Sequence, residues 1–321
     1  MNVNEIQAFV SIARLGGVTR AAGRLHRSQP AITRRIKLLE NQLGASLLER
    51  RRGGVILSEA GRAFLPYAEA VLAALKDGEE AVKALHGAKR GTVSLALVGT
   101  LAATTLVDQL KRFSLKYKNV QLELRTANSQ EVGDLVRRAE VSFGLRYFSD
   151  SSPELISQQI SQERMVVACA PEHRWAGGHV RDPGQLREEC WVAFPLARDR
   201  RDSLAHLVVR QLTAARLDGV KILEIDSLTA QKRLVEARFG IAMLPESSIQ
   251  EELRLGTLGI IDVPALHAAV PIFVVYRKNG YFSGASRALL SLIARVPIKP
   301  QMSPPRGKER RPKAKRRARS D

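Results

Sequence analysis

Between residues 92 and 298, short β-rich runs alternate with stretches whose apolar residues recur at helical spacing. This alternation is typical of α/β domains, in which helices cover the faces of a largely parallel sheet. Strands are expected at the runs TVSLALVG, VQLELRTA, VSFGLRY, RMVVACA, CWVAFP, VKILEI, GIAMLP, LGIIDV and IFVVYR. Helices are expected near residues 104–117, 129–140, 202–216, 228–239, 246–255 and 284–296. This length suits one large sheet or two subdomains, and periodicity does not choose between them.

The first sixty residues instead carry apolar residues at helical spacing and predict three short helices. Thr19 is the expected cap of the second helix and Ser28 that of the third. Pro30 falls in the first turn of the third helix, where its missing N–H is not needed. The next stretch, ERRRGGVILSEAG, predicts a hairpin that turns at its glycines. The third helix is expected to bury the residues Ile32, Ile36, Leu39 and Leu43.

A long helix is predicted to begin after Ser58 and to run to about residue 86. Pro66 is expected to kink its first turns. The apolar residues of this helix form a narrow seam, which suits pairing with a partner helix better than packing in a core. The sequence therefore predicts a homodimer that forms along this helix. The residues of the seam are Val71, Leu75, Gly78, Val82 and Leu85.

The formal net charge is +19, and the basic residues are concentrated at the two ends of the chain. Such a charge favours a polyanionic partner, either nucleic acid or an anionic membrane surface. Residues 299–321 are rich in lysine, arginine and proline, with Met302 as their one bulky apolar residue. This segment cannot bury enough apolar surface to fold alone, so a disordered basic tail is expected. The tail either adds nonspecific phosphate contacts or only improves solubility.

The exposed side of the third predicted helix carries side chains that can enter the major groove of DNA. Arg34 can bind guanine with two hydrogen bonds, Thr33 can meet a thymine methyl or a phosphate, and Gln29 can reach adenine. The start of this helix and the basic hairpin are expected to hold phosphates. A solvated basic helix face is the alternative interpretation. The predicted DNA-binding residues are Ser28, Gln29, Pro30, Thr33, Arg34, Lys37, Arg50, Arg51 and Arg52.

Residues 9–61 resemble the winged helix-turn-helix of LysR-type transcriptional regulators. The resemblance rests on many residues at fixed spacing, namely Phe9, Gly16, Thr19, Ala21, Ala22, Leu25, Ser28, Gln29, Pro30, Ala31, Thr33, Ile36, Leu39, Glu40, Leu43, Gly44, Leu47, Glu49, Arg50, Leu57, Ser58, Ala60 and Gly61. The sequence departs from the usual family pattern at Gly17, Leu48 and Ser58, none of which is a candidate for reading a base. The length and alternation of the remaining chain also fit the family, to about residue 298.

The resemblance implies a DNA-binding domain, a linker helix, and an effector-binding domain that resembles periplasmic binding proteins. A small-molecule effector would lie between two α/β subdomains joined by two crossovers at a hinge. Double-stranded DNA with a dyad-symmetric operator, a homotetramer and RNA polymerase are the partners implied. The implied boundaries are 1–58 for the winged helix-turn-helix, 59–90 for the linker, 91–298 for the effector-binding domain (subdomain I 91–163 with 268–298, subdomain II 164–267) and 299–321 for the tail.

In this family the cleft residues come from the ends of particular strands, so the matching positions can be placed one by one. The expected effector-binding residues are Thr100, Leu101, Ala102, Asn128, Ser129, Arg146, Phe194, Thr229 and Pro245. Arg146 stands out because a lone arginine at the end of a strand needs an anionic partner, so an anionic effector is expected. The alternative for each residue is a helix cap or an ordinary polar loop position.

Other functions find little support in the sequence. The histidines are scattered, and no nucleophile-elbow, Walker or metal-spaced motif occurs, so neither an enzyme nor a metal or cofactor is expected. Cys169 and Cys190 leave redox sensing open, because one branch of the family senses peroxide through a cysteine pair. No signal-peptide pattern and no long apolar run is present, so a cytoplasmic protein without a membrane segment is expected. A nucleoid-type protein that coats DNA nonspecifically is the alternative to a regulator.

Overall fold

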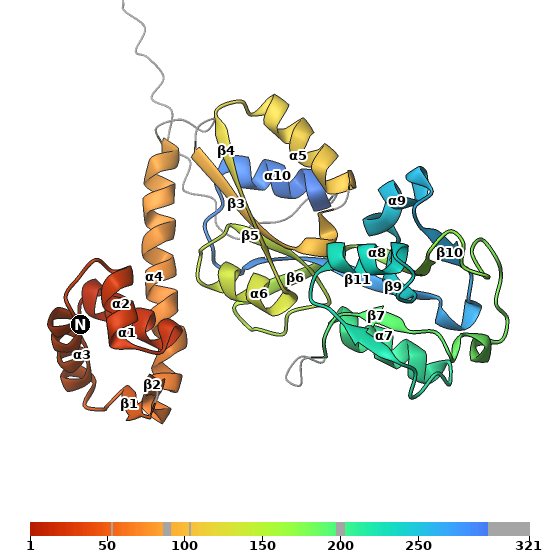
Figure 1. The fold of residues 1–321 in the computed structure, drawn as a ribbon. Helices are drawn as coiled ribbons and strands as arrows, with labels where there is room; N and C mark the ends of the chain where they lie inside the picture. The colour runs from red at the N-terminus through yellow and green to blue at the C-terminus, as the bar shows by residue number, and fades with distance from the viewer. Residues whose placement is uncertain (53, 86–90, 103, 197–202, 295–321) are drawn as a thin grey trace, which may run out of the picture.

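The computed structural model describes residues 1–52, 54–85, 91–102, 104–196 and 203–294. The predicted tail at 299–321 lies outside the described residues. Three helices and a two-stranded hairpin form an N-terminal unit, called the head below (Figure 1). Its elements are α1 (Val3–Leu15), α2 (Val18–Arg24), α3 (Gln29–Leu43), β1 (Leu48–Arg51) and β2 (Gly54–Leu57).

Local sequence explains where the helices of the head begin and end. The backbone N–H of Asn2 donates to the Glu5 carboxylate at 2.8 Å, which closes a capping box at the start of α1. Gly16 ends α1 in the left-handed conformation. One predicted cap is wrong, because α2 begins at Val18 and Thr19 lies inside that helix. Ser28 is the N-cap residue of α3 as predicted, but its side chain makes no cap hydrogen bond.

The apolar faces of α1 and α3 pack against each other and form the core of the head. Leu43 was expected in this core, but its side chain is 39% exposed because it is the last residue of α3 and projects at the helix end. The core includes Ile6, Phe9 and Ile12 of α1 with Ile32, Ile36 and Leu39 of α3.

A single long helix, α4 (Glu59–Leu85), leads from the head to the rest of the molecule (Figure 1). Ser58 caps it, since the Ser58 hydroxyl accepts a hydrogen bond from the Gly61 N–H at 2.9 Å. The helix continues without interruption through Pro66. With 27 residues it is about 40 Å long. Of the predicted apolar seam, Val71, Leu75 and Val82 are exposed.

The rest of the described chain, called the α/β region below, is built on a seven-stranded sheet with the order β10-β6-β11-β5-β3-β4, in which β9 also pairs with β6. The expectation of a largely parallel sheet is wrong. Only the pairs of β3 with β4 and β5 are parallel, whereas β6 pairs antiparallel with β9, β10 and β11. The strands are β3 (Gly91–Val98), β4 (Val120–Ala127), β5 (Phe143–Tyr147), β6 (Leu155–Cys169), β9 (Ala242–Pro245), β10 (Gly259–Ile261) and β11 (Ala268–Arg277).

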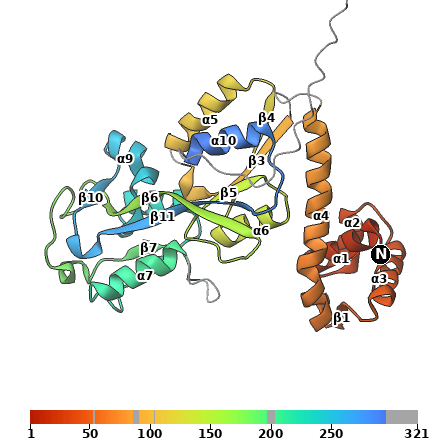
Figure 2. The ribbon, with the colours of Figure 1, turned by 180° about the vertical axis from the view of Figure 1, so that it is seen from behind.

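Two long strands, β6 and β11, run through both halves of the α/β region (Figures 1 and 2). Their antiparallel pairing extends from Leu155 opposite Arg277 to Met165 opposite Ala268. The strand predicted at residues 164–170 is therefore only the second part of β6. The predicted subdomain boundary between residues 163 and 164 falls inside this strand.

Helices cover both faces of the sheet. In one half, α5 (Thr104–Lys116) and α10 (Gly284–Ala294) pack on one face and α6 (Ser129–Arg137) on the other. In the other half, β6 directs Met165 and Val167 toward α7 but Val166 toward α8, as the two-residue period of a strand requires. The elements of this half are a small parallel pair, β7 (Trp191–Ala193) with β8 (Ile222–Glu224), and the helices α7 (Leu204–Ala214), α8 (Leu228–Glu236) and α9 (Gln250–Leu255).

Candidate DNA-binding surface and ligand cleft

The start of α3 presents the predicted base-reading side chains to solvent. Burial of Ile32, Ile36 and Leu39 against α1 turns the opposite side of the helix outward. The side chains of Gln29 and Arg34 are exposed. Of the nine predicted DNA-binding residues, Thr33 is half-buried, and the exposed ones are Ser28, Gln29, Pro30, Arg34, Lys37, Arg50, Arg51 and Arg52.

The β1–β2 hairpin is held against the end of α1. The N–H of Val55 donates to the Gly16 carbonyl at 3.1 Å, which ties β2 to the end of α1. Gly54 has a φ of +154°, and a Cβ at this position would lie 2.7 Å from the same carbonyl oxygen. A side chain at residue 54 is therefore excluded, and the hairpin can approach α1 closely.

The cations of this surface are available for a partner. Within the described parts of the chain, no ion pair involves Arg34, Lys37 or the three arginines of the hairpin. Gln29 differs, because its side-chain oxygen accepts a hydrogen bond from the Thr19 hydroxyl at 3.4 Å. This bond joins α2 to α3 and gives Thr19 a structural role that the sequence did not indicate. The arrangement can meet phosphates and base edges without first breaking internal ion pairs.

A cavity of about 680 Å³ lies between the two halves of the α/β region. It is placed where the carboxyl ends of β3, β4 and β5 face β7 and the first turns of α7 and α8. Three helices, α6, α7 and α8, begin at its walls, so their first-turn backbone N–H groups lie close to the cavity, although the N-cap side chain of each helix already accepts a hydrogen bond from one of these groups. Helix N-termini are favourable positions for a negatively charged group.

Five of the nine predicted effector-binding residues line this cavity, and four do not. Leu101 is buried in the main apolar core, and Ala102 is exposed outside the cavity. Thr229 is exposed on α8, where Asp226 and Leu228 line the cavity in its place, and Pro245 is buried in β9. The cavity is lined, among others, by Thr100, Asn128, Ser129, Arg146 and Phe194.

Arg146 is not the lone cation that the sequence indicated. Its guanidinium forms an ion pair with Asp150, and its Nε donates to the Tyr147 carbonyl at 3.3 Å. The side chain is only 8% exposed. Burial raises the pKa of Asp150, but hydrogen bonds from Ser152 and the charge of Arg146 outweigh burial and lower it. The positive charge of Arg146 is thus already balanced by a residue of the same turn.

Two hydroxyl groups of the cavity stand out by their burial. The hydroxyls of Tyr147 and Thr100 are buried next to each other, and neither makes a well-formed hydrogen bond to any other described residue. Burial also raises the pKa of the Tyr147 phenol, which therefore remains protonated and able to donate. Tyr147 was not among the predicted site residues, although it follows Arg146 at the end of the same strand and an aromatic residue there was a usable signal.

The cysteines do not form a redox pair in this structure. Cys169 and Cys190 are both free, and Cys169 is fully buried in β6. Burial raises the pKa of the Cys169 thiol to about 11. Because the thiolate is the reactive form, this environment makes Cys169 a poor nucleophile.

Among the described residues, no cluster of three or more histidine, cysteine, aspartate or glutamate side chains has the arrangement needed to hold a metal ion. None of the helices described is both long and apolar enough to cross a bilayer.

Comparison with known protein families assigns both parts of the chain. Residues 3–62 match the bacterial regulatory helix-turn-helix of the LysR family, and residues 86–297 match the LysR substrate binding domain. Among curated proteins, the chain is 25% identical over 294 residues to the RuBisCO operon transcriptional regulator of Allochromatium vinosum, covering 91% of this chain and 95% of that one. It is also 26% identical to the regulator CitR of Bacillus subtilis, covering 92% and 99% of the two chains.

Solved structures show the same architecture over the whole chain. The regulator CbnR in complex with its target DNA is 25% identical, with a TM-score of 0.60 over 92% of this chain and 99% of that one. Full-length OxyR C199D of Pseudomonas aeruginosa has a TM-score of 0.66 over 92% and 94% of the two chains at 19% identity, which shows the fold alone. With a head, a linker helix and an α/β region that all match, the chain belongs to the LysR family of transcriptional regulators.

Proposed function

We propose that this regulator reads an operator through α3 and the β1–β2 hairpin, and that a small anionic effector bound in the 680 Å³ cavity modulates its binding or its activating function. The observation that carries the DNA part is the exposed, unpaired basic surface of the head. CbnR, at 25% identity, is solved with its target DNA, which supports the same use of this surface. A nonspecific nucleoid-type protein is not favoured, because the family consists of regulators with a substrate-binding domain.

The proposal for the effector rests on the walls of the cavity rather than on Arg146. Three helix N-termini supply partial positive charge, and the hydroxyls of Tyr147 and Thr100, which have only each other as neighbouring polar partners, supply hydrogen-bonding groups. Phe194 and the neighbouring Pro195 add apolar surface on the opposite wall. These features together suit a small molecule with a carboxylate and an apolar part. LysG of Corynebacterium glutamicum was solved with bound effector Arg, so the same architecture also holds effectors of other chemistry.

We expect the subunits to pair along α4, because Val71 and Leu75, one helical turn apart, leave apolar surface exposed. A homotetramer of two such pairs is part of the same proposal, and contact with RNA polymerase stays a prediction. Sedimentation equilibrium of the full chain tests the pairing, and a mass of one chain at micromolar concentration would contradict it.

Two head variants test the proposed DNA surface. Duplexes enriched from a random pool by the full-length protein serve as the operator, and fluorescence anisotropy at fixed salt measures affinity for operator and random DNA. Arg34→Ala is expected to lose about 5- to 150-fold in operator affinity while its affinity for random DNA changes little, because a bidentate base contact is lost. Arg51→Ala is expected to weaken binding to both duplexes equally and to lower the salt slope by about one.

The matched control is Arg112→Ala, which removes an exposed arginine of α5. Operator affinity that is unchanged in both Arg34→Ala and Arg51→Ala would move the DNA surface elsewhere. An operator-to-random ratio near one in the wild-type protein would instead favour nonspecific binding.

Two cavity variants test the effector site. A thermal-shift screen of the full chain against small carboxylates, aromatic acids and amino acids supplies ligands, and calorimetry measures their affinity. Tyr147→Phe and Thr100→Val each remove one hydroxyl with little change in shape, so each is expected to weaken a ligand about 2- to 10-fold. Thr229→Val, which makes a similar exchange outside the cavity, is the control. Ligands that bind all three variants like the wild type would place the effector site elsewhere.

A further inference from the structure

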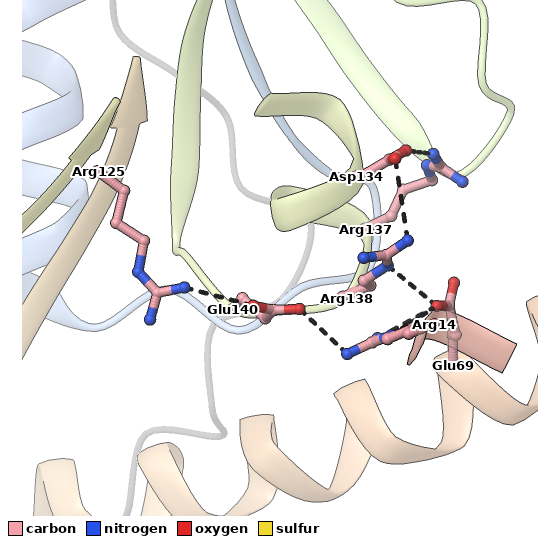
Figure 3. A network of polar contacts seen from close by, with 7 residues as sticks. All are labelled: Arg14, Glu69, Arg125, Asp134, Arg137, Arg138 and Glu140. Carbon is pink, nitrogen blue, oxygen red and sulfur yellow. Dashed lines mark hydrogen bonds and ion pairs between the residues drawn. The ribbon is translucent and has the colours of Figure 1, made fainter. Parts of the chain in front are cut away.

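An arginine of the head is held by two carboxylates from other parts of the molecule. Arg14 lies in the last turn of α1. Its Nη2 lies 3.1 Å from the Glu69 carboxylate of α4, and its Nη1 lies 3.1 Å from the carboxylate of Glu140, which follows α6 (Figure 3). One guanidinium therefore joins the head to the linker helix and to the α/β region at the same time.

Glu69 is the centre of this contact. Its Oε1 also lies 3.0 Å from the Nε of Arg138, and its side chain is 10% exposed. The largely buried Glu69 carboxylate therefore lies between Arg14 of the head and Arg138 of the α/β region. Without the charge of Glu69, Arg14 and Arg138 would repel each other across this junction, so the docking of the head depends on charge.

The contacts continue on both sides with alternating sign (Figure 3). Glu140 also lies 3.3 Å from Arg125 of β4, and Arg138 lies 3.9 Å from Asp134 of α6. Alternation leaves no pair of like charges as direct partners, so the contacts support one another. In order along the chain of contacts, the members are Arg125, Glu140, Arg14, Glu69, Arg138, Asp134 and Arg137. This set is called the clamp below.

Further contacts dock the linker helix beside the clamp. Asp77 of α4 accepts two hydrogen bonds from Arg277 of β11, at 2.8 and 2.6 Å. Lys76 donates from its Nζ to the carbonyl of Ala139 at 2.7 Å. Residues 138–140 are therefore contacted both by the head and by α4, and they form the point at which the α/β region meets the rest of the chain.

The helix α6 connects this point to the ligand cavity. Its first residues, Ser129 and Gln130, line the cavity, and its C-terminal part carries Asp134 and Arg137 of the clamp. Asp150, the partner of Arg146, lies so close to α6 that a Cβ added at Gly133 would collide with its carboxylate. A nine-residue helix has little freedom to bend, so movement at one end is transmitted to the other.

We infer that the clamp is an intramolecular docking surface that fixes the orientation of the head, and that displacement of α6 at the cavity is passed to the head through Arg138 and Glu140. The inference about the route from the cavity rests on the proposed effector site. The docking itself does not, because it follows from the contacts of Arg14 and Glu69 alone.

The docking is tested by the distance between the head and the α/β region. Spin labels at Gln42→Cys on α3 and Gln121→Cys on β4, both exposed, report this distance by pulsed electron resonance in the full chain with Cys190→Ser. Labelled chains are diluted with unlabelled ones so that distances between subunits do not contribute. The wild type is expected to give one narrow distribution, and the double variant Glu69→Gln, Glu140→Gln a broad or shifted one.

Glu251→Gln, which breaks the exposed pair with Arg254 on α9, is the matched control and is expected to leave the distribution unchanged. An ionic strength of about 1 M is expected to broaden the wild-type distribution toward that of the double variant, since partly exposed ion pairs are screened by salt. A distribution in the double variant identical to that of the wild type overturns the clamp.

The route from the cavity is tested with a second set of variants on the same labels. Asp150→Asn and Gly133→Ala disturb the contact between α6 and the turn that follows β5, so each is expected to change the distance between head and α/β region. Neither is expected to change this distance further when it is combined with Glu69→Gln and Glu140→Gln. Gly284→Ala, which adds a methyl group in open space on α10, is the control. No change with either variant overturns the route while leaving the docking. Because the measurement uses neither DNA nor effector, its failure does not touch the proposed function.

Discussion

Asp150, which was not predicted as a site residue, determines the role of the predicted residue Arg146. It pairs with Arg146, its carboxylate accepts from the Ser152 N–H at 3.0 Å, and its own backbone N–H donates to the Ser157 hydroxyl at 3.0 Å. Its side chain is 12% exposed. The pair stabilises the turn after β5 next to the cavity, so Arg146 shapes the wall of the cleft instead of offering an unbalanced charge to the effector.

The lowered pKa of Asp150 predicts a pH-dependent contribution to stability. A carboxyl whose pKa is lowered by folding stabilises the protein at pH values above its ordinary pKa near 4, and this contribution is lost as the pH falls through the folded value. Asp150→Asn is therefore expected to lower the free energy of unfolding at pH 7 by roughly 1.5–3 kcal/mol. Urea unfolding at a series of pH values should show this difference shrink only below about pH 4.

Asp108→Asn, on the exposed surface of α5, is the control and should show little difference at any pH. If the difference between Asp150→Asn and the wild type stayed constant into acid, Asp150 would not be the group whose ionisation stabilises this turn.

At the scale of elements, α4 contains one glycine that is tightly packed and one that has open space beside it. A Cβ at Gly61 would collide with the Leu47 carbonyl oxygen, so this glycine allows the first turn of α4 to pack closely against the head. Gly78, later in the same helix, has nothing within 4 Å of such a Cβ. The first glycine is required by packing, whereas the second only lowers the helix propensity of the linker.

The same substitution at these two positions is predicted to have opposite effects. Gly61→Ala is expected to destabilise the protein by about 1–3 kcal/mol, because the backbone must move to relieve the collision. Gly78→Ala is expected to stabilise it by about 0.5–1 kcal/mol through its better helix propensity. Thermal unfolding of the two variants, compared with the wild type, measures both effects. A lower melting temperature for both would mean that Gly78 has a further role, for example in pairing of the linker helices.

At the scale of the whole molecule, positive charge is concentrated at the two ends of the chain. The head carries its unpaired cations on one surface, and residues 299–321 hold ten lysines and arginines. Each additional phosphate contact releases a counterion and steepens the salt dependence of DNA binding. The tail therefore has a measurable signature if it contacts DNA.

Deletion of residues 299–321 is predicted to flatten the slope of the logarithm of affinity against the logarithm of salt by several units, while the preference for operator over random DNA is kept. Anisotropy titrations at four salt concentrations measure the slope. A chain in which the same residues are replaced by a glycine-serine segment of equal length controls for the loss of length. An unchanged slope would assign the tail to solubility.

Much of the head was predictable because its determinants are local. Helical spacing of Ile6, Phe9, Ile32 and Ile36, together with the glycines at the helix ends, depends on residues within a turn or two of each other. The hydrogen bonds at the helix starts were harder to predict. The Thr19 hydroxyl bonds to the Gln29 side chain instead of a backbone N–H, and the Ser28 side chain makes no cap hydrogen bond, because the packing of α2 against α3 decides which partners are within reach.

The sequence alone determined the alternation of strands and helices, the basic ends and the family, because these follow from periodicity, composition and fixed spacing along the chain. Only the tertiary structure decided the antiparallel pairing of β6 with β11, the partner of Arg146, the membership of Tyr147 rather than Thr229 in the cavity, and the clamp around Glu69. The physical reason is that strand pairing and ion pairing join residues up to two hundred positions apart, as Asp77 and Arg277 are, and no local pattern records which distant groups will meet.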